Sequence, residues 1–466
     1  MVWARRSGSD ASVLRRTDPL DAGTQITLRD SVGKTGPHPS TAGSLVVWSE
    51  SSGIASYRTD TAAYETFGVV GKSNLTPVTD GTNVAWIVGA ADDDWRLLVR
   101  TPSGTGTVVN SRYVLSMPAV GDGRVVWTSN LDALGDDSDI EWTVLSEVPP
   151  VIVTPVAGED RYETAIKAAR LAFPDGANAV VIATGANWPD ALGGAALAGA
   201  LDAPILLTAK DTLPASVEAE IKALGVSEAY VLGGAAAIGP AVESRLATVL
   251  GAGKVKRFPG VDRYHTASLI AAEVARLEGP AYSECVFIAT GANFPDALAA
   301  APLAAAGRRP IVLAGPSGLD ARTVQTLRDT GVTRAYILGG VEAVPESVAD
   351  QAKSAFGVTP VRLSGDTRYT TALAVAEHGV DSAGLGLGWD GVAFATGLNY
   401  PDALAGGVMQ GSTGSVMLLT SGTTIHEQVL TRVRAERAQI GEVRFLGGLQ
   451  AVPYGVRDLV AAALQP

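Results

Sequence analysis

The sequence is poor in residues that carry covalent and metal chemistry. Its 466 residues include one cysteine and four histidines, and 18% of them are charged. A single thiol, Cys285, excludes both an intrachain disulfide and a thiolate metal site. No uninterrupted run of about 18 apolar residues occurs, which argues against a membrane-spanning helix. No membrane insertion and no resident metal or cofactor are therefore expected.

Basic residues are also scarce. Thirty-six Lys and Arg residues are outnumbered by 48 Asp and Glu residues, so that the net charge is −12. A protein with this negative net charge repels the phosphates of double-stranded nucleic acid, which is therefore not expected as a partner. Hydrophobic residues make up 46% of the chain, too many for an intrinsically disordered protein. At roughly 100–200 residues per domain, the length predicts a multi-domain protein.

The first third of the chain repeats with a β-strand pattern. Trp48, Trp86 and Trp127 end the stretches SLVVW, TNVAW and GRVVW, each nine residues after a proline. Short β-branched runs between Gly, Asp, Ser and Pro residues predict antiparallel strands joined by hairpins. Arg-Thr pairs recur 42 residues apart, which is the size of a four-stranded propeller blade. The pattern resembles TolB-type β-propellers, so residues 1–147 are expected to form an all-β, partial β-propeller.

Three full periods and a fragment are present, which suggests a truncated N-terminus that has lost further blades and an export signal. The apolar stretch of a secretory signal is missing from the first residues. The repeated tryptophans are expected to fill the core, with carbohydrate stacking as the alternative. The acidic stretches 92–94 and 136–139 are candidate calcium ligands, but solvated turns are the favoured interpretation.

A second kind of repeat begins after a proline-rich segment. The sequence EVPPVIVTP predicts an extended linker over 148–155. Beyond it, four blocks recur three times in the same order: GEDRYETA, GVDRYHTA and GDTRYTTA; ATGANWPDAL, ATGANFPDAL and ATGLNYPDAL; PILLT, PIVLA and VMLLT; VLGGAAAIG, ILGGVEAVP and FLGGLQAVP. Apolar strands alternating with helices predict three α/β modules, each with a parallel sheet covered on both faces.

These recurring blocks resemble the type 2 cell wall binding repeat family. On this basis repeat 1 spans 156–253, repeat 2 spans 254–359 and repeat 3 spans 360–466. The resemblance implies Toprim-like topology and a pseudo-threefold arrangement of the modules. It also implies non-covalent attachment to an anionic secondary polymer of the Gram-positive cell wall, teichoic-acid-like or polysaccharide. The expected location is secreted, in the cell wall or at the cell surface.

The resemblance points to the PILL-type strand as the polymer site, with cations near its ends. The third copy has Ser415 and Val416 in place of the proline and no adjacent cation. The candidate ligand-binding residues are Pro204, Ile205, Leu206, Leu207, Lys210, Arg308, Arg309, Pro310, Ile311, Val312, Leu313, Met417, Leu418 and Leu419.

Other repeated residues are assigned structural roles. Each Arg-Tyr block carries an acid beside its arginine, which suggests an ion pair at a helix start, with polymer phosphate as the alternative. The NxPDAL aspartate favours a helix N-terminus, although its turn also resembles a phosphate cradle. The aromatic before that proline is expected to pack between modules rather than stack on a sugar. The structural residues are Arg161, Tyr162, Asp190, Arg263, Tyr264, Asp296, Arg368, Tyr369 and Asp402.

Catalytic motifs are missing from the sequence. It contains no HExxH, GxSxG or Walker motif, and its Leu-Gly-Gly repeats lack the GxGxxG spacing. The favoured hypothesis is a non-catalytic surface protein that the three modules anchor to the wall. Its propeller segment would serve interaction or display, with a protein partner. The alternative is a truncated hydrolase, similar to N-acetylmuramoyl-L-alanine amidases, whose repeats target it to the wall.

Overall fold

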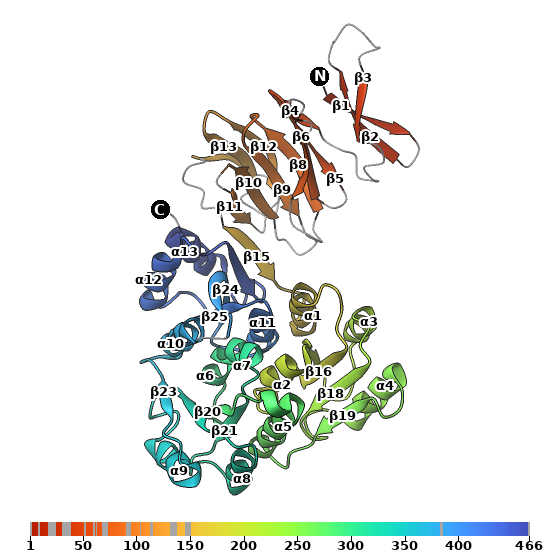
Figure 1. Cartoon of the computed structure of the whole chain (residues 1–466). Coiled ribbons are helices and arrows are strands. Elements are labelled where there is room, and N and C mark those ends of the chain that lie inside the picture. Colours follow the sequence, from red (N-terminus) through yellow and green to blue (C-terminus); the bar gives the residue numbers. More distant parts are fainter. Residues whose placement is uncertain are drawn as a thin grey trace. The chain divides into compact units, whose positions relative to one another are not determined.

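A computed structural model gives the structure of this chain (Figure 1). It describes residues 151–382 and 385–464 without a gap. Before them it describes the segments 2–7, 10–16, 25–29, 39–50, 53–58, 61, 63–67, 73–89, 95–102, 104–111, 115–130 and 138–144. The chain divides into two compact units, one of residues 1–153 with 464–466 and one of residues 154–463.

The first unit consists of antiparallel sheets, as the alternating pattern predicts. Its described strands form four sheets that follow one another along the chain, and within each sheet every strand pairs with its sequence neighbour. The strands are β1 (Val2–Ser7), β2 (Asp10–Arg16) and β3 (Gln25–Arg29); β4 (Ser40–Ala42), β5 (Leu45–Glu50), β6 (Gly53–Arg58) and β7 (Tyr64–Phe67); β8 (Ser73–Thr79), β9 (Val84–Gly89), β10 (Trp95–Thr101) and β11 (Gly104–Ser111); β12 (Leu115–Gly121), β13 (Arg124–Asn130) and β14 (Ser138–Val144).

The repeated tryptophans lie in the core of this unit. Trp48, Trp86 and Trp127 stand on β5, β9 and β13, the second strands of three successive sheets, and are 0%, 1% and 6% exposed. The predicted core role is therefore confirmed. The acidic residues 92–94 and 136–137 lie outside the described residues. Within the described part of the chain, no three His, Cys, Asp or Glu residues are grouped so that they could hold a metal ion.

The second unit contains three four-stranded sheets in which the strands of each module pair in parallel. The first module has α1 (Arg161–Ala172), β16 (Ala179–Thr184), α2 (Gly194–Leu201), β17 (Ile205–Thr208), α3 (Ala215–Ala223), β18 (Glu228–Leu232), α4 (Pro240–Leu250) and β19 (Val255–Phe258). The second has α5 (Arg263–Glu278), a 3-10 turn (Gly279–Ala281), β20 (Cys285–Thr290), α6 (Pro295–Ala299), α7 (Ala301–Gly307), β21 (Ile311–Ala314), α8 (Ala321–Asp329), β22 (Arg334–Leu338), α9 (Glu346–Phe356) and β23 (Val361–Leu363).

The third module has α10 (Arg368–Asp381), β24 (Gly388–Thr396), α11 (Pro401–Ser412), β25 (Ser415–Thr420), α12 (Glu427–Glu436), β26 (Glu442–Leu446) and α13 (Tyr454–Leu464). The alternation of apolar strands with helices that the sequence predicts is thus found in all three copies. In the first two modules the strands and helices share one apolar core each, for example Val180 and Ile182 of β16 with Val217 and Ile221 of α3. No helix in the described ranges is long and apolar enough to cross a membrane.

The edge strand of the third sheet comes from the other end of the unit. β15 (Ile152–Val156) pairs with β26, in the place that β19 and β23 take in the first two sheets. In those two sheets Gly233 and Gly339 donate their N–H groups to the last residues of β19 and β23, over 3.1 and 2.9 Å. Gly447 donates in the same way to Val156 over 2.9 Å. The segment before the first module thus closes a ring of three modules.

This pairing differs from two expectations about the chain's organisation. The predicted linker over 148–155 contains the greater part of β15, while its residues 148–150 lie outside the described ones. The predicted cuts after residues 253 and 359 assign β19 and β23 to the following repeats. By strand pairing, each belongs to the sheet of the module before it.

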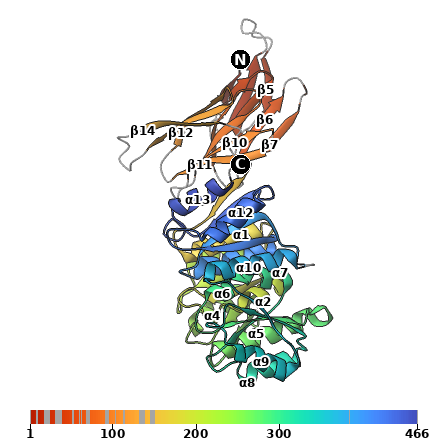
Figure 2. The same ribbon diagram turned by 90° about the vertical axis from the view of Figure 1, so that its left-hand side faces the viewer.

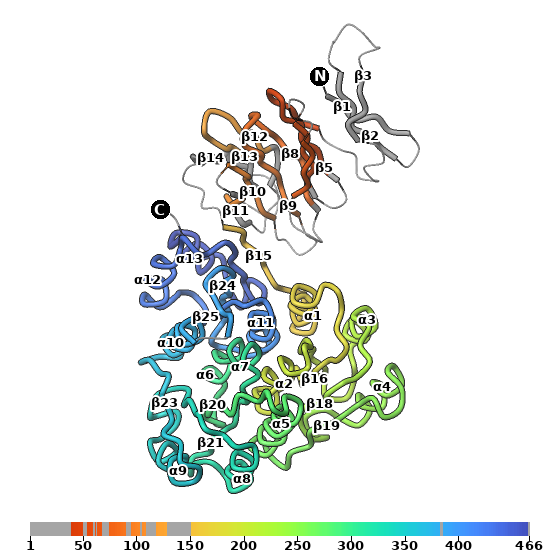
Figure 3. Tube along the Cα trace, in the orientation of Figure 1, coloured from red at the N-terminus to blue at the C-terminus, as the bar shows by residue number. Residues whose placement is uncertain are grey.

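Three equivalent helices, α2, α7 and α11, pack against one another at the centre of the ring (Figure 1). Figure 2 shows α2 and α7 from the side. Small residues let their backbones approach closely. A Cβ at Gly199 of α2 would collide with the carbonyl of Ala305 in α7, and one at Gly411 of α11 would lie 2.6 Å from the carbonyl oxygen of Pro302. The trace in Figure 3 follows the modules around this centre in sequence order.

Candidate functional site

Each NxPDAL block forms a turn at the carboxyl end of the first strand of its module. Thr184 ends β16, and its Oγ1 accepts a hydrogen bond from the N–H of Ala186 over 3.2 Å. The Asn187 side chain accepts one from the N–H of Trp188 over 3.0 Å. Both bonds recur at Thr290 and Asn293 and at Thr396 and Asn399. Because these N–H groups are already paired, the turn offers fewer free donors to a phosphate than the sequence pattern suggests.

The Arg-Tyr blocks brace these turns. Nη1 of Arg263 donates to the carbonyl of Gly291 over 2.7 Å, and Arg368 donates to Gly397 over the same distance. Arg161 makes the matching bond to Gly185. The tyrosine rings lie against the same glycines, so that a Cβ there would collide with Tyr162, Tyr264 or Tyr369. The glycine of each ATG sequence is thus required by the ring that covers it.

The acids next to these arginines have a separate role. Oδ1 of Asp160 accepts hydrogen bonds from the N–H groups of Tyr162 and Glu163, and Asp262 accepts one from His265 over 2.8 Å. In the third copy Thr367, rather than Asp366, caps the helix. The expectation of an ion pair at each helix start was wrong, because the arginine binds a carbonyl while the acid or threonine binds backbone N–H groups.

The three aromatic residues of the NxPDAL blocks converge. The ring centroids of Trp188 and Phe294 are 6.0 Å apart, and those of Phe294 and Tyr400 are 6.2 Å apart. The buried hydroxyl of Tyr400 donates to the carbonyl of Gly185 over 2.7 Å, which joins the third module to the first. The guanidinium of Arg263 lies 4.9 Å from the centroid of the Trp188 ring, which joins the second module to the first. Packing between modules, the favoured interpretation, is what the structure shows.

The repeated aspartates lie against the Leu-Gly-Gly turns. Asp190, Asp296 and Asp402 place a carboxylate beside the first glycine of each turn, Gly233, Gly339 and Gly447, whose φ values of 95°, 98° and 93° favour glycine.

Two of these carboxyl groups resist ionisation. Asp296 and Asp402 lie in the first turns of α6 and α11. Burial raises the pKa of Asp296, although the charge of Arg368 opposes this. Burial likewise raises the pKa of Asp402, against a hydrogen bond from Thr164 and the charge of Arg161. Desolvation therefore outweighs the nearby arginine charge at both positions and, at Asp402, the hydrogen bond from Thr164 as well.

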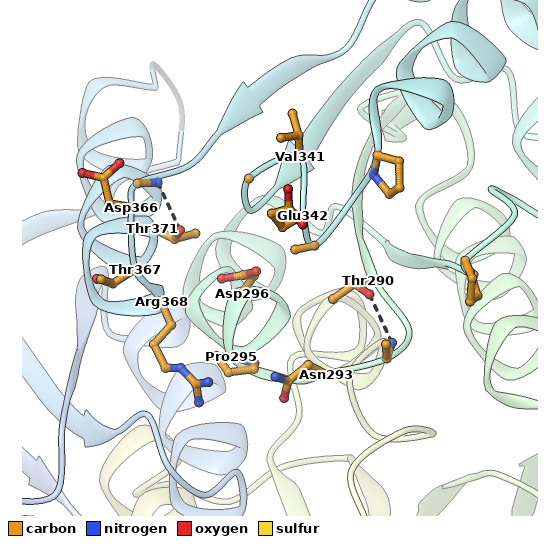
Figure 4. A pocket seen from close by; sticks show the side chains of 17 residues that line it. Thr290, Asn293, Pro295, Asp296, Val341, Glu342, Asp366, Thr367, Arg368 and Thr371 are labelled. Carbon is orange, nitrogen blue, oxygen red and sulfur yellow. Dashed lines mark hydrogen bonds between the residues drawn. The ribbon is translucent and has the colours of Figure 1, made fainter.

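Two cavities open at the carboxyl edges of the sheets, where one module meets the next. The first junction cavity has a volume of about 310 Å³ and is lined by strand-end residues of the first module, among them Lys210, and by residues 260–263. The second junction cavity, of about 770 Å³, is lined by the equivalent residues of the second module and by the start of α10. Figure 4 shows Asp296 between Arg368 and Glu342 in the second cavity.

The PILL-type strands lie inside the sheets. The side chains of β17, β21 and β25 are buried, and Leu206, Val312 and Leu418 are each 0% exposed. Pro204 and Pro310 are buried as well. β17 and β21 bring their following loops to the junction cavities, while the side chains of all three strands form core. The residues Ile205, Leu207, Ile311, Leu313, Met417 and Leu419 are 0% or 1% exposed.

The predicted cations fall at opposite edges of their sheets. Lys210 follows β17 and lines the first junction cavity at the carboxyl edge. Arg308 and Arg309 precede β21 and therefore stand at the amino edge. Arg308 pairs with Glu278 over 3.2 Å, and Arg309 is 8% exposed. The structure thus brings Lys210 together with Asp190 and Arg263, and does not bring the arginine pair to a junction cavity.

Sequence reasoning missed several polar residues of the second junction cavity. Thr290, Asn293 and Glu342 line the second junction cavity, with Asp366 across from them. The sequence could have pointed to Asn293 and Glu342, because both belong to repeated blocks that directly follow predicted parallel strands. Ligands of parallel α/β sheets characteristically bind at that edge.

Comparison with known proteins identifies one family and several relatives. The family model of cell wall binding domain 2 (CWB2) matches residues 156–243, 257–349 and 362–457. The N-acetylmuramoyl-L-alanine amidase LytC of Bacillus subtilis (strain 168) is 28% identical over 270 residues, which are 58% of this chain and 50% of LytC. The amidase enhancer of the same organism is 30% identical over 269 residues, which are 58% of this chain and 35% of the enhancer. This chain thus spans half or less of each of these curated relatives.

Two solved structures share the fold. Cwp6 from Clostridium difficile superposes with a TM-score of 0.60 at 20% identity, over 83% of this chain and 66% of Cwp6. Cwp8 from the same organism gives a TM-score of 0.60 at 18% identity, over 98% of this chain and 88% of Cwp8. Three matches to one family model, in the order of the three modules, cover more than half of the sequence. The chain belongs to the cell wall binding domain 2 family.

Proposed function

We propose that this chain is a surface protein that attaches non-covalently to an anionic secondary polymer of the Gram-positive cell wall. The observation that carries the proposal is the pair of junction cavities, because both are built at equivalent places from two adjacent modules of a wall-binding family. A polymer that runs past one junction would meet a cavity at the equivalent place of the next. Secretion to the wall or cell surface follows from this role.

The chemistry of the cavities suits a saccharide. Asn293, Thr290 and Arg368 offer hydrogen-bond donors and acceptors around the second cavity, and Asn187 with Arg263 does so around the first. Concave sites at the carboxyl ends of parallel strands are usual ligand sites in α/β folds. We place the polymer here, with the buried PILL-type strands supporting the site from beneath.

Two finer assignments belong to the same proposal. The four antiparallel sheets of the first unit are taken as blades of a β-propeller that presents a surface to a protein partner. The modules are taken as Toprim-like in topology, without the chemistry of topoisomerases. The repeats act as an anchor and carry no catalytic residues.

The test is a sedimentation assay with the full chain. Gram-positive wall fragments that carry their secondary polymer should bring the protein into the pellet. Fragments from which the polymer has been removed should leave it in solution. Equal binding to bare peptidoglycan would contradict polymer recognition.

A second candidate function is wall hydrolysis, and the similarity to LytC is the observation that favours it. The purified full chain should release no amino groups or reducing sugars from wall fragments if the anchoring proposal holds. Release of free amino groups in proportion to the amount of protein would establish the hydrolase instead.

A further inference from the structure

The two junction cavities occupy equivalent places but carry different charges. Lys210, two residues after β17, lines the first cavity, whereas Pro316, two residues after β21, lines the second. In the Leu-Gly-Gly turns, Ala236 lines the first cavity and Glu342 the second. The first cavity thus has an additional cation and the second an additional acid.

The cations of the first cavity are available to a ligand. Arg263 is held in place by the bond of its Nη1 to the carbonyl of Gly291 and by the Trp188 ring, and it lines the cavity. Lys210 is exposed, and it forms no ion pair with any residue that the structure describes.

One of the two acids at the first cavity is already committed. Asp262 accepts the N–H of His265 at Oδ1 and pairs through Oδ2 with Arg322 over 2.8 Å. Arg322 also pairs with Asp320 over 2.8 Å. The second acid, Asp190, lies against Gly233. An incoming anion would therefore meet two cations and one carboxylate, Asp190, which forms no ion pair with any residue that the structure describes.

The second cavity presents the opposite balance. Asp296, Glu342 and Asp366 line it together with a single cation, Arg368. Nη1 of Arg368 is bonded to the carbonyl of Gly397, as Nη1 of Arg263 is to that of Gly291, so this arginine is not what distinguishes the two cavities. Three acids around one cation repel an anion, whereas the hydroxyl groups of an uncharged sugar can donate to these carboxylates.

The third junction also lacks the lysine. Gly422 stands two residues after β25, where the first module has Lys210, and Gln450 takes the place of Ala236. The block that begins the first module supplies Arg161 with Glu159 and Asp160 beside it. The pairing of a lysine with an arginine is therefore particular to the first junction.

We propose that the first junction cavity holds an anionic group of the polymer, a phosphate or a carboxylate, between Lys210 and Arg263. The second junction cavity takes uncharged sugar units. This inference rests on the proposed attachment to an anionic polymer, and it assigns different parts of the polymer to modules that look alike in sequence. Local cations are needed at such a site because the chain as a whole carries a net charge of −12.

The test compares Lys210→Gln with a matched variant, Lys254→Gln. Lys254 precedes β19 at the amino edge of the same sheet, so both variants lose one positive charge from the first module. Binding of the full chain to polymer-bearing wall fragments is measured over a range of NaCl concentrations. Lys210→Gln should bind roughly tenfold more weakly at low salt, and the slope of log affinity against log salt should shrink by roughly 0.7–0.9. Lys254→Gln should match the parent in both.

Chemical treatment of the fragments identifies the anionic group. Carbodiimide amidation of carboxyl groups should abolish the difference between parent and Lys210→Gln if the group is a carboxylate. The difference should persist after amidation, and disappear after phosphodiester cleavage, if it is a phosphate.

An exchange variant tests the location independently. Pro316→Lys combined with Glu342→Ala gives the second cavity the residue types of the first. In the Lys210→Gln background, this pair should restore salt-dependent binding. If the parent binds but Lys210→Gln binds equally at every salt concentration, or if Lys254→Gln is weakened as much, the inference is overturned while the proposed function stands. If the parent itself does not bind, the proposed function fails and the inference fails with it.

Discussion

The N–H of Gly447 donates to the carbonyl of Val156 over 2.9 Å, although the two residues lie near opposite ends of the three-module unit. The side chain of Val156 is 0% exposed. Through this pair, the third module is completed by a strand that precedes the first. The stability of the third sheet therefore depends on residues outside its own repeat.

Val156→Ala should destabilise the unit by about 1–3 kcal/mol, because it removes buried methyl groups from this closing strand. Hydrogen exchange should speed up most in β26, which pairs with β15. The matched control is Val361→Ala at the start of β23, where the side chain is 55% exposed, and it should change little. Faster exchange spread evenly over all three sheets would argue against a local closing role.

Gly199→Ala should separate the central helices. The added Cβ would collide with the carbonyl of Ala305, so we expect a loss of about 1–3 kcal/mol in denaturant unfolding. Gly455→Ala in α13 is the control, since no atom lies within 4 Å of its added Cβ. That variant should gain about 0.5–1 kcal/mol from the better helix propensity of alanine. If the two variants changed the free energy of unfolding equally, the backbones of α2 and α7 could move apart to accommodate the added methyl group at little cost.

Asp296→Asn should stabilise the protein at neutral pH. An acid whose pKa is higher in the folded chain than its ordinary value of 3.8 binds more protons when folded. As the pH rises from 3.8 through the raised pKa of the folded protein, Asp296 ionises and the free energy of unfolding falls. The parent should lose thermal stability over that range, and the asparagine variant should lose less.

Asp320→Asn is the control with the opposite sign. Burial raises the pKa of Asp320, but hydrogen bonds from Thr323 and Arg322 outweigh this and lower it overall. Its contribution to stability is present above pH 3.8 and is lost as the pH falls through the lowered value, so the variant should melt lower than the parent at neutral pH. A lower melting temperature for Asp296→Asn at pH 7 would show that Arg368 keeps that carboxyl group ionised.

Tyr400→Phe should weaken the contact between the third module and the first. The variant loses the buried hydroxyl that donates to the carbonyl of Gly185 over 2.7 Å, while Arg161 still donates to the same oxygen. We expect a cost of about 0.5–1.5 kcal/mol in urea unfolding. Tyr230→Phe should cost less, because that hydroxyl bonds within its own strand to Glu228 over 3.2 Å. No measurable loss in Tyr400→Phe would show that Arg161 alone satisfies the carbonyl.

Local patterns predicted most of the fold. The stretches VVIAT and VFIAT became β16 and β20, because a continuous apolar run between two helices is stable only as a strand buried on both faces. The placement of Trp86 in the core was predicted for a similar reason, since a large ring at a fixed point of each repeat fills space between strands.

The parts that could not be predicted depend on contacts between distant residues. The pairing of β15 with β26 leaves no local signal, because either strand could pair along any open edge. The candidate site could be predicted only in part, since Lys210 and Arg308 both adjoin PILL-type strands in the sequence. Lys210 follows β17 and so lies at the carboxyl edge of its sheet. Arg308 precedes β21 and so lies at the amino edge of its sheet.

β15 also determines the order in which the sheets of the three modules can be completed. β15 is synthesised before every strand of the sheet that it completes, whereas β19 and β23 follow directly on the strands of their own modules. Closing a loop as long as the three modules costs entropy, and pairing between distant segments is slow. The first two sheets can therefore form as their residues emerge, while the third must wait for the last module. During that interval the open edge of β15 is exposed to pairing with other chains.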